Sequence, residues 1–285
     1  METLFYRPRS LSEAVELMNR QDGAVIVNGG SDIVLAIAAK KISPGSIVYV
    51  ADIDGMDQIV DDGEYLRIGG AVTYKQMQKS PVCQRVTGLM ESIRHLGSPP
   101  VRAVATPAGN IATAAPSADC ATMLLALGAE VVLVSAGGER VLAQKDIYTG
   151  TYKTAIQKNE IIREIRFGSL KKREGSGFYR LSRRKSQDIA KVLVGAVVRL
   201  DEFGRCTGST ISLGALNATA VLSPSTSTLI QGLKMDDAIE AAEKHFPSEA
   251  GLRESYFKRY KELTTSTVVA RALAMAYNEA QGRLQ

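Results

Sequence analysis

Tryptophan is absent from the 285-residue sequence, and aromatic residues make up only 6% of it. Histidine is nearly as scarce, with His95 and His245 far apart in the chain. A catalytic triad or a metal site built from several histidines is therefore a poor candidate. Each histidine is interpreted as a surface or helix-end residue.

Cysteine occurs three times, at Cys83, Cys120 and Cys206. The odd number and wide spacing match neither a disulfide framework nor a metal or iron–sulfur motif. Long apolar runs are missing as well, because none approaches the ~18 residues of a membrane span, and charges interrupt the first segment where a secretory signal would be apolar. We therefore expect a cytoplasmic protein in a reducing compartment, with no membrane span.

The remaining composition is typical of a globular protein. Hydrophobic residues make up 45% and charged residues 23% of the chain, and its length suits two domains. The net charge of +5 is distributed along the sequence, so a basic face toward an acidic partner is as consistent as nucleic-acid binding, which nothing else indicates. Neither G-x-G-x-x-G nor G-x-x-x-x-G-K-[ST] occurs, which excludes the Rossmann and P-loop signatures.

The stretch Val104–Val131 combines a polar loop, a helix and a strand. Ser117 is the expected N-cap of the helix, and Gly128 is its expected stop. A loop rich in small residues that enters a helix N-terminus is a natural anion site, because unpaired N–H groups face it. The stretch thus indicates a phosphate site, with an ordinary turn and capped helix as an equally weighted alternative. Its flexible or short polar residues are Gly109, Asn110, Thr113, Ser117 and Asp119.

A second glycine loop, Asn28–Asp32, lies between a predicted strand, Ala24–Val27, and an apolar segment with helical character. Further strands are expected at 46–50, 65–68, 130–135, 140–142 and 161–167. The polar, glycine-rich run Gly168–Gly177 is interpreted as the linker between two domains. The part after it is expected to contain β segments at 178–184, 189–200 and 206–216 and helices at 236–245, 248–263 and 265–281.

Taken together, NGGSD at Asn28–Asp32 and TPAGNIATAAPSAD at Thr106–Asp119 resemble the two flavin-binding loops of the molybdenum hydroxylase flavoprotein subunit. That family includes the medium subunits of xanthine dehydrogenase and of aerobic carbon monoxide dehydrogenase. Its first loop usually reads A-G-G-T-D or A-G-G-H-S, and its second T-I-G-G-N followed by a T-A-S-P-x-A-D-like run. An IGA-x-x-T-like segment, Ile68–Thr73, and an R-R-x-x-x-D-I-A-x-V segment, Arg183–Val192, also match.

The resemblance covers nearly the whole chain and implies an α+β fold. It implies a two-lobed FAD-binding domain of the vanillyl-alcohol-oxidase-like (PCMH) type in residues 1–172, with lobes at about 1–55 and 56–172. A C-terminal α+β domain of the CO dehydrogenase flavoprotein type, with a small β-sheet and helices, is expected in residues 173–285.

The resemblance further implies that FAD lies extended between the lobes, with the first loop and part of the second around its pyrophosphate. Asp119 would accept a hydrogen bond from a ribose or ribityl hydroxyl, and Arg180 would lie near the flavin. Leu96 and Ile162 align with positions near the flavin and adenine rings, although apolar residues at such positions more often belong to the core. No catalytic residue and no metal ligand is expected. The expected cofactor-binding residues are Val27, Asn28, Gly29, Gly30, Ser31, Asp32, Leu96, Thr106, Gly109, Asn110, Thr113, Asp119, Ile162 and Arg180.

The second loop departs from the family pattern at Pro107-Ala108, where Ile-Gly is common, and the first has Asn28 for the usual Ala. A positive φ at Ala108 would be strained, whereas a negative φ would be harmless.

The function implied is that of an FAD-binding electron-transfer subunit of a molybdenum hydroxylase complex. Electrons would pass from the [2Fe–2S] clusters of a small subunit, which receives them from a molybdenum-cofactor large subunit, through FAD to NAD⁺ or another acceptor. Two alternatives stay open: a stand-alone FAD-dependent oxidoreductase, and a flavin-free assembly subunit, which Pro107-Ala108 keeps in consideration.

Overall fold

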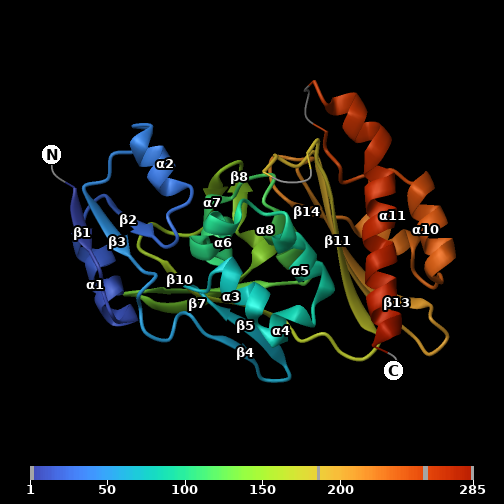
Figure 1. The fold of residues 1–285 in the computed structure, drawn as a ribbon, viewed down its shortest axis with the longest axis horizontal. Coiled ribbons are helices and arrows are strands. Elements are labelled where there is room, and N and C mark those ends of the chain that lie inside the picture. The colour runs from blue at the N-terminus through green and yellow to red at the C-terminus, as the bar shows by residue number, and fades with distance from the viewer. Residues whose placement is uncertain (1–2, 185–186, 253–255, 284–285) are drawn as a thin grey trace.

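The computed structural model describes residues 3–184, 187–252 and 256–283 (Figure 1). It contains three main β-sheets with helices packed between and around them, so the expected α+β class is confirmed. Within the described ranges, no helix is long and apolar enough to cross a membrane.

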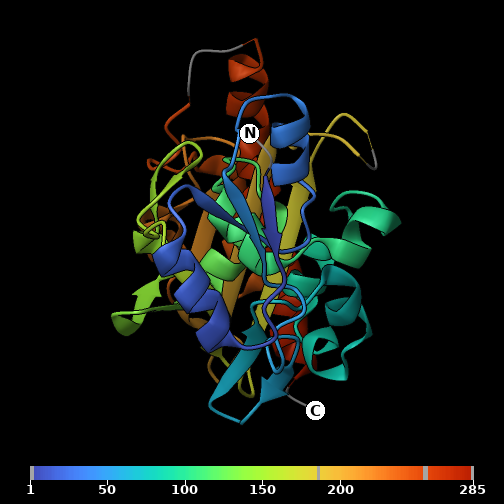
Figure 2. The same ribbon diagram turned by 90° about the vertical axis from the view of Figure 1, so that its left-hand side faces the viewer.

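The first lobe is a parallel three-stranded sheet in the order β1-β3-β2, seen face-on in Figure 2. Its first helix begins at Ser10, whose hydroxyl accepts a hydrogen bond from the Glu13 backbone N–H at 3.2 Å, and it buries Ala14 and Met18 against the sheet. The elements of this lobe are β1 (Leu4–Tyr6), α1 (Leu11–Arg20), β2 (Ala24–Val27), α2 (Ile33–Ala38) and β3 (Ser46–Tyr49).

The second lobe is an antiparallel five-stranded sheet in the order β4-β5-β10-β6-β7. Apolar residues of these strands, such as Ile68 and Ile165, form one buried core with Leu89, Ile111 and Leu124 of the helices. The strands are β4 (Ile59–Asp61), β5 (Tyr65–Gly69), β6 (Glu130–Ser135), β7 (Gly138–Ala143) and β10 (Ile161–Gly168), with a short ribbon of β8 (Tyr148–Gly150) and β9 (Lys153–Thr154). The helices are α3 (Tyr74–Lys79), α4 (Pro81–Gln84), α5 (Thr87–Arg94), α6 (Pro99–Val104), α7 (Pro107–Thr113) and α8 (Asp119–Ala126).

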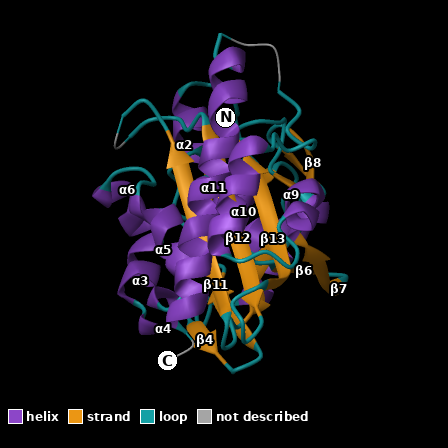
Figure 3. Cartoon of the chain, turned by 90° about the vertical axis from the view of Figure 1, so that its right-hand side faces the viewer, coloured by secondary structure: helices purple, strands orange, loops and turns teal. Residues whose placement is uncertain are grey.

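The C-terminal part is an antiparallel four-stranded sheet in the order β11-β12-β13-β14. Helix α11 crosses one face of this sheet, and α5 and α8 pack on the other (Figures 1 and 3). The elements are β11 (Glu174–Leu181), β12 (Val192–Leu200), β13 (Cys206–Gly214), β14 (Val221–Leu222), α9 (Pro224–Leu229), α10 (Met235–Lys244) and α11 (Lys258–Gly282).

The glycine-rich run expected to be a linker belongs in part to the sheet, because β11 begins at Glu174. The reason is the close approach of α11. A Cβ atom at Gly175 would lie 2.2 Å from the carbonyl oxygen of Ala276, and one at Gly177 would lie 2.1 Å from that of Ala272. The glycines therefore allow the helix backbone to rest on the strand, and the connection shortens to the five residues between Gly168 and Glu174.

Helix α8 is buried along its whole length, since all eight of its residues are buried. Met123 and Ala126 pack with Phe178 and Leu193 of the C-terminal sheet, while Leu124 belongs to the core of the second lobe. The helix thus contributes to the core of the second lobe and to a separate apolar cluster against the C-terminal sheet. The start expected at Ser117 is wrong by one residue, because Ala118 is the N-cap and no side chain caps the helix.

The carboxylate of Glu279, near the end of α11, joins three elements. Its Oε1 accepts hydrogen bonds from the backbone N–H and the hydroxyl of Thr87, both at 2.9 Å. Its Oε2 accepts from the backbone N–H and the hydroxyl of Ser176 on β11. Because Thr87 is the first residue of α5, this carboxylate from the C-terminal helix satisfies a donor at the open end of α5.

Candidate cofactor-binding site

The first glycine loop leaves β2 at Val27 and makes direct backbone contact with the end of α6. A Cβ atom at Gly29 would lie 1.9 Å from the carbonyl oxygen of Val104, so no side chain fits between the two segments. Gly30 has φ +70°, a conformation that favours glycine. Among the described residues, none accepts a hydrogen bond from the backbone N–H groups of Gly29, Gly30, Ser31 or Asp32. The loop therefore presents free N–H donors.

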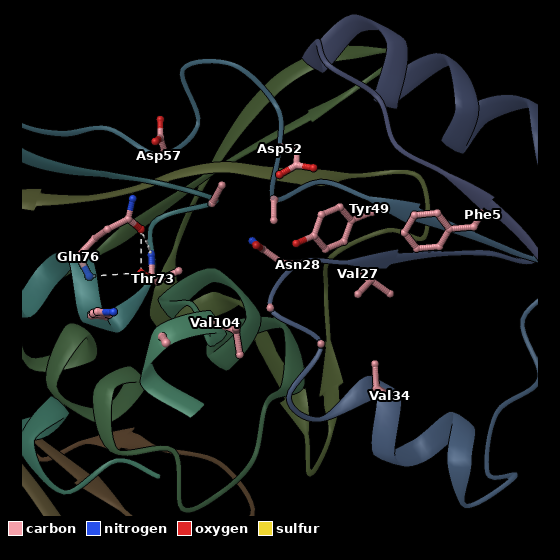
Figure 4. A pocket seen from close by; sticks show the side chains of 16 residues that line it. Phe5, Val27, Asn28, Val34, Tyr49, Asp52, Asp57, Thr73, Gln76 and Val104 are labelled. Atoms are coloured by element: carbon pink, nitrogen blue, oxygen red, sulfur yellow. Dashed lines mark hydrogen bonds between the residues drawn. The ribbon is translucent and has the colours of Figure 1, made fainter. Parts of the chain in front are cut away.

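A cleft of about 610 Å³ opens beside this loop, between the two lobes (Figure 4). Its size is in the range typical of ligand pockets. Val27, Asn28, Gly29 and Gly30 of the predicted set line it. The remaining wall combines side chains of both lobes: Phe5, Val34, Tyr49, Ala51, Asp52, Asp57, Ala71, Thr73, Lys75, Gln76, Ala103 and Val104.

The second loop is a helix where the sequence indicated a polar loop. Thr106 is the N-cap of α7, and its hydroxyl accepts a hydrogen bond from the Gly109 backbone N–H at 3.0 Å. Pro107 occupies the first turn, where its missing N–H costs nothing. Ala108 lies inside the helix, has no positive φ and is 5% exposed. The departure from the family pattern at Pro107-Ala108 is thus harmless, and the reason for considering a flavin-free subunit falls away.

The two loops meet beyond the contact of Gly29 with Val104. The hydroxyl of Thr113, at the end of α7, donates a hydrogen bond to the Asp32 carboxylate at 3.2 Å. Asn110 connects α7 to α8, because its Oδ1 accepts a hydrogen bond from the Ala121 backbone N–H at 3.1 Å. Three side chains predicted to bind the cofactor, those of Asp32, Asn110 and Thr113, therefore form hydrogen bonds that join the loops to each other and to α8.

Asp119 and Arg180 form a buried ion pair that links α8 to β11. Their Oδ1 and Nη1 atoms are 3.2 Å apart, and the guanidinium also donates hydrogen bonds to the backbone carbonyls of His95 and Asp188. Burial raises the pKa of Asp119 to about 6, against the opposing effect of Arg180. Neither Asp119 Oδ1 nor Arg180 Nε has a hydrogen-bond partner in the described part of the chain. Asp119 Oδ1 is in ion-pair contact with the guanidinium without a hydrogen-bond geometry, and both atoms are shielded from solvent.

Leu96 and Ile162 are half-buried at the edge of the second-lobe core. Leu96 follows α5, and its carbonyl oxygen accepts a hydrogen bond from Arg102 at 2.9 Å. The carbonyl oxygen of Ile162 lies close to Gly70, where a Cβ atom would approach it to 2.1 Å. Both side chains have a partly exposed edge, and their contact with the rings of the cofactor stays a prediction.

Several residues of the cleft wall were not anticipated from the sequence. Phe5 and Tyr49 stand on neighbouring strands with ring centroids 6.0 Å apart. Thr73 and Gln76 form a capping box at the start of α3, and Figure 4 shows that this box borders the cleft. No local pattern marks a strand residue as a cleft residue, because its exposure depends on the opposite lobe.

The residues present fit FAD. Free N–H donors at Gly29–Asp32 suit a pyrophosphate, which requires several donors close together. The adjoining cleft is far larger than a phosphate needs and has room for an adenosine. The Oδ1 atom of Asn28 has no hydrogen-bond partner among the described residues and is an acceptor for the amino or hydroxyl groups that FAD carries.

The chain matches two family models. The first, the FAD-binding domain in molybdopterin dehydrogenase, matches residues 1–168. The second, the CO dehydrogenase flavoprotein C-terminal domain, matches residues 177–276.

Among known proteins, the chain is similar to the nicotinate dehydrogenase FAD-subunit of Eubacterium barkeri, with 27% identity over 74% of each chain. It is also similar to a putative xanthine dehydrogenase FAD-binding subunit of Escherichia coli, with 26% identity over 99% of this chain and 98% of that one. A solved carbon monoxide dehydrogenase of Hydrogenophaga pseudoflava shares the fold, with a TM-score of 0.88 and 24% identity over 98% of each chain.

The first family model covers more than half of the chain, and the matched residues include both glycine loops of the chain. The chain therefore belongs to the molybdenum hydroxylase family, as an FAD-binding medium subunit of an oxidoreductase of the xanthine and CO dehydrogenase type.

Proposed function

We propose that this subunit passes electrons from the [2Fe–2S] clusters of a small partner subunit through FAD to NAD⁺ or another acceptor. The electrons originate at the molybdenum cofactor of a large partner subunit, where the substrate of the complex is oxidised. Relatives named as a medium subunit of nicotine 6-hydroxylase and a medium chain of carbon monoxide dehydrogenase support a multi-subunit assembly.

The state of the cysteines is the observation that carries this proposal. Cys83 and Cys120 lie in the core of the second lobe and Cys206 in the core beneath α11, and all three are free thiols. Burial raises the pKa of Cys83 to about 11 and that of Cys120 to about 12. A [2Fe–2S] cluster needs four ligands close together, most often cysteine thiolates. Within the described residues, no three histidine, cysteine or acidic side chains come together to hold a metal ion, and we assign the iron–sulfur donor to a partner. Free thiols also agree with a reducing, cytoplasmic location.

Bound FAD would supply the centre that accepts and releases electrons. The residues of this chain would hold and orient it. Backbone N–H groups of Gly29–Asp32 would bind the pyrophosphate, and the cleft beside Asn28 would take the adenosine. Asp119 and Arg180, Leu96 and the first turn of α7 would lie on the flavin side. The proposed division after residue 172 falls within the short connection between β10 and β11.

Isolation of the complex tests this function. A tagged chain expressed with its neighbouring genes should co-purify with iron–sulfur and molybdenum subunits in a fixed ratio. Anaerobic reduction with dithionite should bleach the visible flavin band. NAD⁺, a quinone and oxygen are then added separately, and the physiological acceptor should restore the band. A chain that purifies alone and itself oxidises a small substrate would contradict the proposal.

A further inference from the structure

Asn28 directly precedes Gly29, and only one of the two polar atoms of its side chain has a hydrogen-bond partner among the described residues. Its Nδ2 donates a hydrogen bond to the carbonyl oxygen of Gly70 at 2.6 Å. A carbonyl can only accept, so this bond fixes which end of the amide is nitrogen. The Oδ1 atom therefore faces away from Gly70. It is shielded from solvent and has no hydrogen-bond partner among the described residues.

A buried acceptor without a donor destabilises a protein, and most such atoms in native structures are paired. Asn28 is one of the residues that line the cleft, and Figure 4 places it at the centre, between Tyr49 of the first lobe and Thr73 of the second. Because Asn28 lines the cleft, a bound ligand can supply the missing donor once the atoms that shield Oδ1 shift aside.

The polar and charged groups of the cleft wall indicate which part of a dinucleotide binds beside Asn28. The N–H donors of Gly29–Asp32 suit the negatively charged phosphates. The wall around Asn28 instead carries the carboxylates of Asp52 and Asp57 and one ammonium group, that of Lys75. Asp52 is also paired with Arg7. The wall therefore has no excess of positive charge to attract a phosphate, and its acceptors favour a neutral group with hydrogen-bond donors. In the adenosine half of FAD, these donors are the adenine amino group and the ribose hydroxyls.

We propose that Asn28 Oδ1 accepts a hydrogen bond from the adenosine half of FAD, either from a ribose hydroxyl or from the adenine amino group. The bond to Gly70 holds the amide in place before the ligand arrives, so no rotamer freedom is lost on binding. Asn28 is then a specificity residue that distinguishes FAD from FMN, which lacks the adenosine. The inference rests on the cofactor site described above and adds a contact to it.

Affinity measurements on the apoprotein test this contact. FAD titrations followed by flavin fluorescence should give a dissociation constant about tenfold larger for Asn28→Ala than for the wild type, as expected for one lost hydrogen bond to a buried acceptor. Affinity for FMN should be the same in both proteins. Wild-type affinity for FAD in the variant would overturn the proposal.

Analogues of FAD separate the ligand contact from a structural role of the Gly70 bond. The wild type is titrated with FAD in which hypoxanthine replaces adenine, and with FAD lacking the 2′- or the 3′-hydroxyl of the adenosine ribose. The analogue without the true donor should bind about tenfold more weakly to the wild type, and this difference should vanish in Asn28→Ala. Equal losses in both proteins would overturn the contact while leaving FAD binding intact. Failure of the wild type to bind FAD would overturn the cofactor site as well.

Discussion

Arg180 and Asp119 are buried against each other, with exposures of only 7% and 11% for their side chains and a closest approach of 3.2 Å. Arg180 belongs to the first strand of the C-terminal sheet, and Asp119 is the first residue of α8. The same guanidinium binds the carbonyl oxygen of His95, next to Leu96. One side chain of the C-terminal part thus fixes two segments on the expected flavin side of the site.

Replacement of Arg180 by methionine should destabilise the protein strongly. The change leaves the Asp119 carboxylate buried without its cation, and breaking a buried pair in this way costs about 3–5 kcal/mol. Urea unfolding of the apoprotein measures the effect. The double variant Arg180→Met/Asp119→Asn should recover part of the loss, because it no longer buries a lone charge. No recovery in the double variant would show that the packing of Arg180, and not its charge, is what matters.

The pKa of Asp119 predicts a pH dependence of stability. Because the pKa is about 6 in the folded protein and 3.8 in the reference state, the folded state binds the proton more tightly. The stabilisation that comes from protonated Asp119 is fully present below about pH 4 and is lost as the pH rises through about 6. The free energy of unfolding of the wild type should therefore fall relative to that of Asp119→Asn across this window. Parallel pH profiles of the two proteins would contradict the raised pKa.

Two glycines of the site should respond differently to substitution. A Cβ atom at Gly109 meets only the Thr106 hydroxyl, at 3.2 Å, and a small shift of that side chain relieves the contact, so Gly109→Val should still fold and should lose FAD if the cofactor lies against α7. Gly29→Ala should lower the midpoint as well, because its Cβ collides with the backbone of Val104. Flavin absorbance per chain and thermal unfolding measure both effects. Full flavin content in folded Gly109→Val would refute the placement of FAD beside this turn.

The Glu279 side chain should contribute far more to the stability of the protein than an exposed glutamate does. In Glu279→Ala, the backbone N–H groups of Thr87 and Ser176 lose their acceptor, at about 1–3 kcal/mol for each group left unsatisfied. The control is Glu240→Ala, which removes an exposed pair with Lys244 and should change stability by less than about 0.5 kcal/mol. Chemical denaturation compares the two. Similar effects for both variants would mean that water replaces the Glu279 carboxylate.

Local patterns predicted the strands well and the helix ends less well. Ala24–Val27 and Glu130–Ser135 have the predicted bounds, because β-branched runs between turn residues are strong local signals. A helix start at Thr265 was wrong, since α11 begins at Lys258. The Thr265 hydroxyl does not cap a helix but donates to the carbonyl oxygen of Lys261 at 2.7 Å, within α11.

The two glycine loops of the site could be found from the sequence, because their residues are contiguous. The pairing of Asp119 with Arg180 could not, since the two are 61 residues apart and meet only through the packing of α8 on the C-terminal sheet. The aromatic wall of Phe5 and Tyr49 was invisible for the same reason. Gly175 and Gly177 were wrongly assigned to a linker, because the residue type alone does not distinguish a glycine required for close packing from a glycine in a loop.

The burial of α8 on all sides limits how freely the two halves of the protein can be exchanged between relatives. A domain joined to another through a few surface contacts can be exchanged between genes, but α8 presents Met123 and Ala126 to one partner and Leu124 to the other. A recombination event that replaced the C-terminal part alone would leave this helix facing a foreign sheet. A chimera that exchanges the two halves would therefore need matching substitutions in α8, where a change on one side requires a change on the other.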